Sequence, residues 1–402
     1  MNALTVWWEQ PWLSDLFLGS YWGLMVCVWL LMLLGITRWG GRWRIHHPLD
    51  APIREDSPWV SICIPARNES LNIGSCVQHA LNSRWPRIEV VVVDDRSTDG
   101  TRAAALEAAQ GNPNLRLVEG TEPPTGWAGK PWACVRASKE ARGAYLLFID
   151  ADVCIHPEAV QTAVRIAEER NLGLVSFFGS WTLVGFWERA LIPVVGWLIR
   201  GAIDLDKVNS RGSALAFGNG QFMLFERAAY AAVEGHKAVF NHVLDDVRMA
   251  EALNRAGFAT EIRPAFWAFQ VRLYRSLREI INGYTKNLFE GMGRKPLAGL
   301  AAAAFIFIGT ILPFVVVVGG VIGRLLLDWG VPSNFWLTAF VLLCGIQLAF
   351  RARLERFDGR SGALFWMHPI ANVLLMWILL RSTFGVRTQW KGRTFVDGRA
   401  ET

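Results

Sequence analysis

The 402-residue sequence predicts an α/β domain with a mostly parallel sheet, together with membrane-spanning helices on both sides of it in the chain. Two observations predict this fold class. Hydrophobic residues make up 52 % of the chain and charged residues only 19 %, and the apolar excess lies near the N-terminus and after residue 297. Between these regions, short apolar runs alternate with helical segments, which is the pattern of a parallel sheet covered by helices.

The N-terminal apolar segment, residues 16–36, contains no charged residue and is long enough to cross a bilayer as a helix. Arg38, Arg42 and Arg44 follow it. A cleaved signal peptide has its positive charges before the apolar stretch, so we expect residues 1–45 to form an uncleaved anchor. Because positive residues flank the cytoplasmic ends of spans, we expect the following domain in the cytoplasm.

The central domain is expected over residues 57–290. Its apolar runs 60–66, 88–95, 116–120 and 144–153 predict buried strands, and the segments 71–81, 101–110 and 130–141 between them predict helices. Folds of this kind bind ligands at the carboxyl ends of their strands. The segment 183–201 is apolar but contains Glu188, Arg189 and Pro193, and it predicts either an interfacial helix or a buried core helix.

Three apolar stretches follow, at about 298–323, 333–350 and 363–380. We therefore expect two or three C-terminal spans within residues 297–384 and a basic tail over 385–402. Three spans would place this tail on the side opposite the central domain, against the positive-inside rule. The last stretch contains His368, Pro369 and Asn372, so it is the one we expect to be re-entrant if the rule holds.

The net charge of +6 indicates anionic lipid headgroups rather than nucleic acid as the partner, because many basic residues flank apolar runs. The six cysteines show no metal-ligand spacing and are expected to be small buried residues in a reducing compartment.

Asp150 and Asp152 form an Asp-x-Asp sequence at the end of an apolar strand. Two carboxylates so close together repel each other unless a cation lies between them. Mg²⁺ and Mn²⁺ prefer oxygen ligands and leave coordination positions for phosphates. The pair therefore predicts a divalent metal that bridges to a diphosphate, and the alternative is a solvated turn.

Acidic and polar residues also end the first two strands. Asp94 and Asp95 close the second strand, where their carboxylates can accept hydrogen bonds from a ribose or a base, or cap the next helix. Pro65, Arg67 and Glu69 close the first strand, and their turn is expected beside a nucleoside.

Three further sites are open to two interpretations each. Lys130 ends a glycine-flanked loop and can bind a phosphate or occupy an ordinary turn. Asp245 and Asp246 precede a helix and can either take a proton from an acceptor hydroxyl or stabilise the helix dipole. Arg272 and Arg275 can contact a leaving diphosphate or lipid headgroups, and we favour the diphosphate.

The motifs PARNE, VVVDD, GWAGK, FIDADV, VLDD and RLYRS occur in this order between residues 57 and 290. With them the chain resembles membrane-bound family 2 glycosyltransferases of the GT-A fold, and it is most similar to the ceramide glucosyltransferase-like and hopene-associated branch. The tail Trp390-Lys391-Gly392-Arg393 is also similar to that branch.

The resemblance implies a nucleotide-sugar donor, a membrane-lipid acceptor and a bacterial inner-membrane enzyme that needs Mg²⁺ or Mn²⁺. It implies that Asp94 and Asp95 hold the uridine, that Asp152 and Asp150 bind the metal and diphosphate, and that Asp246 of the Asp245-Asp246 pair is the base. Arg272 and Arg275 match the first and fourth positions of a (Gln/Arg)-x-x-Arg-Trp motif, but Ser276 replaces its Trp.

The expected reaction is an inverting transfer of one sugar. The alternatives are a processive polysaccharide synthase, against which Ser276 argues, and a non-catalytic membrane scaffold, against which the complete set of carboxylates argues. The sugar, the lipid and the oligomeric state are not specified by the sequence.

Overall fold

The computed structural model describes residues 11–49, 56–213, 215–242, 244–327, 333–385, 388–390, 393–396 and 399–400. Lys391 and Gly392 of the tail motif lie outside the described residues. The chain divides into two compact units. We call Met1–Trp39, Gly185–Arg200 and Arg294–Phe384 the helical unit, and Gly40–Val184, Gly201–Gly293 and Gly385–Thr402 the sheet unit.

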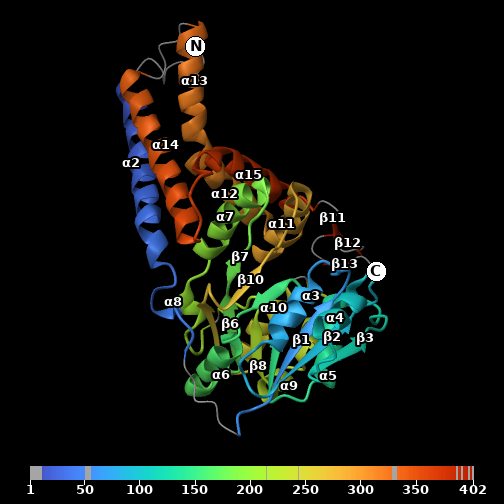
Figure 1. The fold of residues 1–402 in the computed structure, drawn as a ribbon. Helices are drawn as coiled ribbons and strands as arrows, with labels where there is room; N and C mark the ends of the chain where they lie inside the picture. The colour runs from blue at the N-terminus through green and yellow to red at the C-terminus, as the bar shows by residue number, and fades with distance from the viewer. Residues whose placement is uncertain are drawn as a thin grey trace. The chain divides into compact units, whose positions relative to one another are not determined.

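The sheet unit contains a seven-stranded sheet in the order β3-β2-β1-β4-β8-β6-β9 (Figure 1). Its strands are β1 Val60–Ala66, β2 Ile88–Asp94, β3 Leu115–Glu119, β4 Tyr145–Phe148, β6 Leu174–Phe178, β8 Met223–Glu226 and β9 Thr260–Pro264. Strand β8 runs antiparallel to both of its neighbours, and all the other pairs are parallel. The expectation of a mostly parallel sheet is therefore confirmed.

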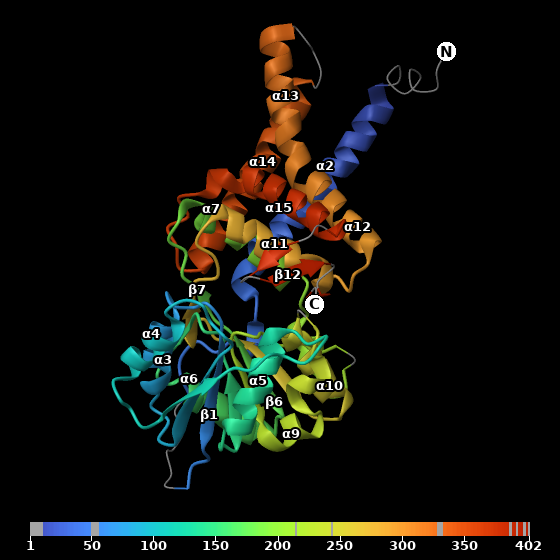
Figure 2. The ribbon, with the colours of Figure 1, turned by 90° about the vertical axis from the view of Figure 1, so that its right-hand side faces the viewer.

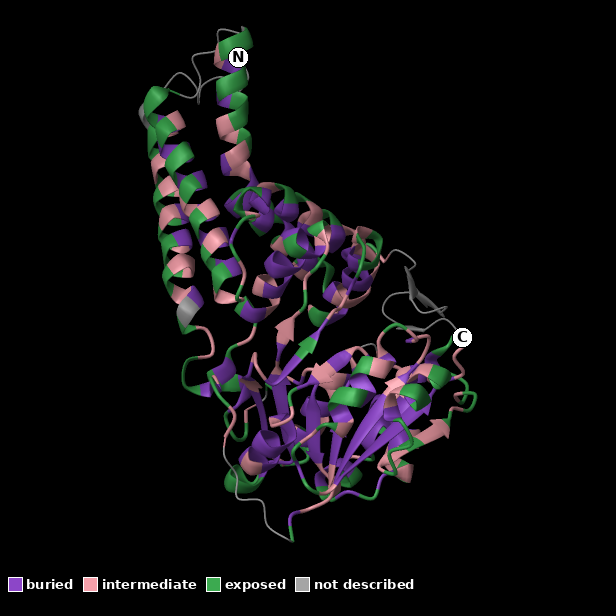
Figure 3. Cartoon of the chain, viewed as in Figure 1, coloured by how far each residue is buried: buried purple, intermediate pink, exposed green. Residues whose placement is uncertain are grey.

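Both faces of this sheet are covered, and this explains the continuous apolar runs of its strands. Side chains alternate along β2, so that Val90 and Val92 pack on one face while Val91 and Val93 pack on the other. The first face is covered by α3 Ile73–Leu81, α4 Thr101–Ala109 and α6 Ala159–Arg170, and the second by α5 Gly129–Glu140, α9 Arg227–Ala232 and α10 Asp245–Arg255 (Figure 2). The central strands are almost entirely buried (Figure 3).

The sheet unit also contains smaller elements. A second sheet has the order β5-β10-β7, with β5 Val153–Ile155, β10 Phe269–Val271 and β7 Ser180–Trp181. The remaining helices are η2 Gly41–Trp43, α8 Leu205–Val208, η3 Gly235–Val239 and α11 Leu277–Gly291. Near the C-terminus, β11 Thr388–Trp390, β12 Arg393–Val396 and β13 Arg399–Ala400 form an antiparallel sheet.

The helical unit consists of α2 Pro11–Gly35, η1 Ile36–Arg38, α7 Phe186–Gly201, α12 Pro296–Ile306, the π-helical turn η4 Phe307–Ile311, α13 Leu312–Leu327, α14 Asn334–Phe357, η5 Phe365–Met367 and α15 His368–Thr383. Helix α2 packs along α14 (Figure 1), where Met25 and Trp29 contact Phe340 and Phe350.

Three helices among the described residues are long and apolar enough to cross a membrane: Leu13–Gly35, Pro296–Leu326 and Asn334–Phe357. This confirms one N-terminal and two C-terminal candidate spans. The third C-terminal stretch forms α15, which has only 16 residues.

Helix α7, predicted as either an interfacial or a buried helix, has a face that is buried within the helical unit. Pro193 lies inside α7 and has no backbone N–H, so the carbonyl of Arg189 one turn earlier lacks its normal helical donor. The Nη2 atom of Arg351 donates to the carbonyls of Arg189 and Ala190, at 2.8 Å each. Its Nε donates to Glu355 Oε1 at 2.8 Å. A guanidinium buried in α14 thereby replaces the hydrogen bond that the proline removes.

Candidate active site

The carboxyl ends of β1 and β2 bring the first group of predicted residues together. The two strands are parallel with Ala66 opposite Asp94, so Arg67 and Asp95 leave the sheet side by side. Arg67 Nη1 donates to the Asp95 carbonyl at 3.0 Å and lies 3.7 Å from Asp95 Oδ2. Pro65 lies within β1, opposite Val93. Both carboxylates at this edge, Asp94 and Asp95, are buried.

The alternative considered for Asp94, a cap of the next helix, is not observed, because α4 begins after Gly100 without a side-chain cap. Asp94 Oδ1 instead accepts from the Ser97 N–H at 3.1 Å, within the loop before α4. The loops after β1 and β2 are then joined by further hydrogen bonds. The Glu69 N–H donates to Thr101 Oγ1 at 2.7 Å, and the Ser70 N–H donates to Asp99 Oδ2 at 3.1 Å. Burial raises the pKa of Asp99, but hydrogen bonds from Thr101 and Ser70 outweigh this and lower it to about 2.

The second group lies around Lys130, at the first turn of α5. Its Nζ is 2.7 Å from Asp150 Oδ1 and 4.0 Å from Asp245 Oδ2. Burial lowers the pKa of Lys130, but the two carboxylates outweigh this and raise it well above its usual value, so that the ammonium stays charged. Lys130 therefore links the Asp-x-Asp turn that follows β4 to the start of α10.

Asp245 and Asp246 are the first two residues of α10, where negative charge suits the helix dipole. Asp246 accepts from two backbone N–H groups, those of Gly220 and Val247, at 2.8 Å each. Burial and the neighbouring Asp245 raise the pKa of Asp246 to about 6, and Lys130 offsets part of this effect. Burial also raises the pKa of Asp245. Asp246 is thus a stronger base than an ordinary aspartate and is still ionised at neutral pH.

Gly220 lies beside the candidate site and was missed by the sequence analysis. A Cβ atom at this residue would lie 3.2 Å from both Asp246 Oδ2 and Lys130 Nζ. Glycine suits this position because any side chain would press the two charged groups away by a few tenths of an ångström. The Gly218-Asn219-Gly220 sequence, a strong turn signal, could have drawn attention to it.

The ladder between β5 and β10 brings the third group to the same region. The strands are antiparallel with Val271 opposite Val153, so one step further along the ladder Arg272 follows opposite Asp152. Two motifs that are far apart in the sequence are thereby placed side by side. Arg275 Nη2 then donates to Asn72 Oδ1 at 2.6 Å, which connects this segment to the loop after β1.

Ser276, the residue in place of the expected Trp, caps helix α11. Its side chain accepts from the Glu279 N–H at 3.2 Å, while Glu279 Oε2 accepts from the Arg275 N–H at 2.8 Å. This reciprocal pair resembles a capping box and fixes the backbone of Arg275.

Among the described residues, no group of three or more His, Cys, Asp or Glu side chains could hold a metal ion. The available donor set is the carboxylate pair Asp150 and Asp152 on the turn between β4 and β5. This set fits Mg²⁺ or Mn²⁺, which proteins often bind through one or two carboxylates while substrate phosphates and water supply the other ligands.

The chain is similar to known proteins over much of its length. Residues 61–232 match the family model of glycosyl transferase family 2. The chain matches this family model from β1 to α9. It is 26 % identical over 351 residues to the 4,4'-diaponeurosporenoate glycosyltransferase of Staphylococcus aureus (strain USA300), covering 84 % of this chain and 88 % of that protein.

A solved mannosyltransferase from Pyrobaculum calidifontis, in complex with GDP-Man and Mn²⁺, has a similar fold. The two chains are 20 % identical with a TM-score of 0.52, and the match covers 89 % of this chain and 99 % of the other. The sheet unit has the GT-A fold, and the family 2 match together with the glycosyltransferase relative supports glycosyltransferase activity.

Proposed function

We propose that this glycosyltransferase moves a single hexose from a UDP-sugar to the hydroxyl or carboxyl group of a membrane lipid, with inversion at the anomeric carbon. The observation that carries the proposal is the Lys130 cluster, in which one ammonium contacts both Asp150 of the proposed donor site and Asp245 beside the proposed base. Donor and acceptor chemistry would therefore meet around one side chain. The similar lipid-modifying relative and the candidate membrane spans support a lipid acceptor.

The donor would lie along the carboxyl edge of the sheet. We assign the nucleoside to Asp94 and Asp95 and to the turn that contains Pro65, Arg67 and Glu69. We assign the diphosphate to Arg272, Arg275 and Lys130. Asp152 and Asp150 would hold Mg²⁺ or Mn²⁺, which would neutralise charge on the departing diphosphate.

The chain's own residues would then carry the transfer. The acceptor oxygen attacks the anomeric carbon opposite the leaving group, and the bond from that carbon to the phosphate oxygen breaks, with the electron pair leaving on UDP. Asp246 takes the proton of a hydroxyl acceptor, for which its raised pKa of about 6 is suited. A carboxylate acceptor has no proton to lose. Arg275 is proposed to stabilise the charge on the leaving group.

The membrane topology supports a cytoplasmic catalytic domain in a bacterial inner membrane. One anchor and two C-terminal spans return the basic tail to the side of the sheet unit, which satisfies the positive-inside rule. At about 1.5 Å per residue, the 16 residues of α15 reach about 24 Å, less than the roughly 30 Å of the hydrocarbon core. We propose that α15 lies at the membrane surface, since Ile370, Val373 and Trp377 are exposed and apolar.

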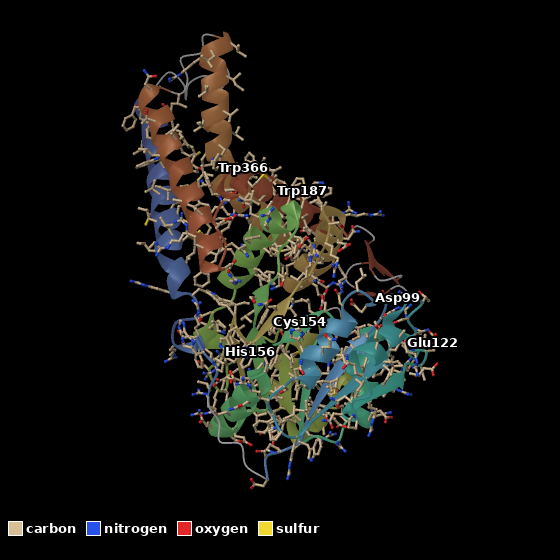
Figure 4. The ribbon with its side chains drawn as sticks, in the orientation of Figure 1. Asp99, Glu122, Cys154, His156, Trp187 and Trp366 are labelled. Atoms are coloured by element: carbon tan, nitrogen blue, oxygen red, sulfur yellow. The ribbon has the colours of Figure 1, made fainter. Side chains whose placement is uncertain are left out.

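Aromatic side chains support this placement of α15. Trp366 lies in η5, the turn that precedes α15. The centroid of its ring lies 6.5 Å from that of Phe186 in α7, and Trp187 follows Phe186 in the chain (Figure 4). Trp is enriched at membrane interfaces. Fusion of green fluorescent protein or of alkaline phosphatase after residue 402 tests the span count: two C-terminal spans predict fluorescence without phosphatase activity, and three predict the reverse.

The test of function uses the full-length protein in detergent with UDP- and GDP-sugars, Mg²⁺ or Mn²⁺, and a bacterial lipid extract, with products identified by mass spectrometry. We expect one hexose-sized mass gain on one lipid class. The gain should be lost in Asp152→Ala and retained in Glu107→Gln, an exposed carboxylate on α4. It should be lost in Asp246→Asn when the acceptor group is a hydroxyl and retained when the acceptor group is a carboxylate. A ladder of sugar additions, or soluble oligosaccharide without any lipid product, would instead indicate a polysaccharide synthase.

A further inference from the structure

Asn72 lies between β1 and α3, at a position where asparagine usually caps the following helix. Its side chain makes no such cap. Instead, Asn72 Oδ1 accepts from Arg275 Nη2 at 2.6 Å, and Asn72 Nδ2 donates to Glu69 Oε2 at 2.8 Å. An amide has one accepting and one donating end, so only this orientation serves a guanidinium and a carboxylate at the same time.

Backbone hydrogen bonds fix both chain segments that this bridge connects, the loop of Glu69 and Asn72 and the segment of Arg275. The Asn72 N–H donates to the Glu69 carbonyl at 2.9 Å, and the loop around it is tied to Asp99 (Figure 4) through the Ser70 N–H. On the other side, Glu279 accepts from the Arg275 N–H. The Arg275 side chain, by contrast, is exposed, so its direction depends on contacts such as that with Asn72.

The bridge separates two opposite charges. Without Asn72, Arg275 and Glu69 would be able to move together into an ion pair, which would turn the guanidinium toward the β1 loop. A neutral amide between them orients Arg275 without neutralising it. It also uses only one of the three guanidinium nitrogens, and the others remain suited to a second, anionic partner.

We propose that Asn72 is a positioning residue for donor binding, which holds Arg275 in the orientation that receives the diphosphate of the nucleotide sugar. The inference rests on the proposed function, because a diphosphate is the group that Arg275 is proposed to bind. It assigns Asn72 no contact with the reacting atoms. Its effect on transfer passes through Arg275 and should disappear when Arg275 is absent.

The test compares Asn72→Ala and Asn72→Asp with Asn82→Ala, in which the same residue type is changed at the exposed C-terminal end of the same helix. The full-length proteins are assayed for UDP and GDP affinity, for donor KM and kcat, and for apparent Tm. A hydrogen bond to a charged group is typically worth a factor of about 10 to 100 in affinity. We expect Asn72→Ala to weaken nucleotide affinity by about 10-fold at unchanged Tm, and Asn72→Asp to weaken it further because the new carboxylate neutralises Arg275. Asn82→Ala should match the wild type.

A double-mutant cycle with Arg275→Ala decides whether Asn72 acts through Arg275. We expect the double variant Asn72→Ala, Arg275→Ala to equal Arg275→Ala alone. Additive losses of nucleotide affinity in the double variant, or an Asn72→Ala protein with wild-type nucleotide affinity, would overturn the inference. Sugar transfer by the wild-type protein would still leave the proposed function intact. A wild-type protein that neither binds these nucleotides nor transfers sugar would overturn both.

Discussion

Gly283 in α11 makes the placement of the two proposed diphosphate-binding arginines testable. A Cβ atom at this position would lie 2.3 Å from Tyr274 Oη and within 2.5 Å of two ring carbons of the same side chain. Tyr274 is 6 % exposed, and its ring packs edge-on against Tyr284 at 5.2 Å between centroids. The ring therefore has to move in Gly283→Ala, and Arg272 and Arg275 lie on either side of it in the chain.

The expected size of the effect follows from two opposing terms. Alanine gains about 1 kcal/mol over glycine within a helix. Overpacking a buried ring costs typically about 1–3 kcal/mol, and three contacts below 3 Å place this case at the upper end of that range. We expect a net loss of about 1–2 kcal/mol in the free energy of unfolding, or a decrease in apparent Tm of about 2–4 °C for a unit of this size.

The matched control is Gly291→Ala in the same helix, where the added Cβ meets only Leu244 Cδ1 at 4.0 Å. This variant should keep or raise its Tm and keep its activity. Gly283→Ala should also raise the donor KM, because the displaced ring moves the arginine segment. Thermal unfolding of the detergent-solubilised proteins and initial-rate kinetics measure both effects. A Gly283→Ala protein as stable and active as Gly291→Ala would refute this account of the Tyr274 segment.

Three further predictions concern charged groups. Because burial raises the pKa of Asp246 to about 6, transfer to a hydroxyl acceptor should decrease as the pH falls through about 6. The raised pKa also means that this group's contribution to folding stability is lost as the pH rises through the same value. Asp246→Asn should therefore exceed the wild type in Tm at pH 8 but not at pH 4. Lys130 lowers the pKa of Asp246, so Lys130→Met should move the acid limb of the pH–rate profile to higher pH, and Lys130→Arg should leave it in place. Removal of one partner from a buried ion pair typically costs about 3–5 kcal/mol in folding stability. Arg351→Met removes the ion-pair partner of Glu355 and should lower the Tm far more than Arg356→Met on the exposed side of the same helix. Equal Tm values for the two variants would contradict the role given to Arg351.

The strands predicted most accurately from the sequence are those whose signal is local. The apolar run 60–66 coincides with β1, and the run 88–95 exceeds β2 by one residue, because strands buried on both faces are continuous apolar segments. The antiparallel strand β8 was not predicted. It has only four residues, and its place between β4 and β6 is set by pairing with strands distant in the sequence.

The candidate site likewise contains residues with a local sequence signal and contacts that depend on residues distant in the sequence. The acidic residues at strand ends could be selected from the sequence because the fold places strand ends together. The role of Asn72 could not, because it depends on Arg275, which lies 203 residues away and reaches Asn72 through the pairing of β10 with β5. Lys130 was named from the sequence as a candidate phosphate ligand. Its contacts with Asp150 and Asp245 require three separate elements to meet, and no local pattern specifies such a meeting.

Helix α7 has a consequence for attempts to obtain the catalytic part of this enzyme in soluble form. It lies in the chain between β7 and β8 of the sheet unit, but it belongs to the helical unit, so the polypeptide passes between the two units five times, after residues 39, 184, 200, 293 and 384. A fragment of residues 40–293 would still contain Leu191, Ile192 and Val195, which are fully buried in the intact chain, and would lack Arg351 to complete the hydrogen bonding around Pro193. Truncation at the termini therefore leaves an exposed apolar helix in the middle of the fragment. For the same reason, proteolytic removal of the N-terminal anchor is not expected to release an active soluble enzyme from the membrane. Replacement of residues 185–200 by a short polar linker is the alteration that a soluble form requires.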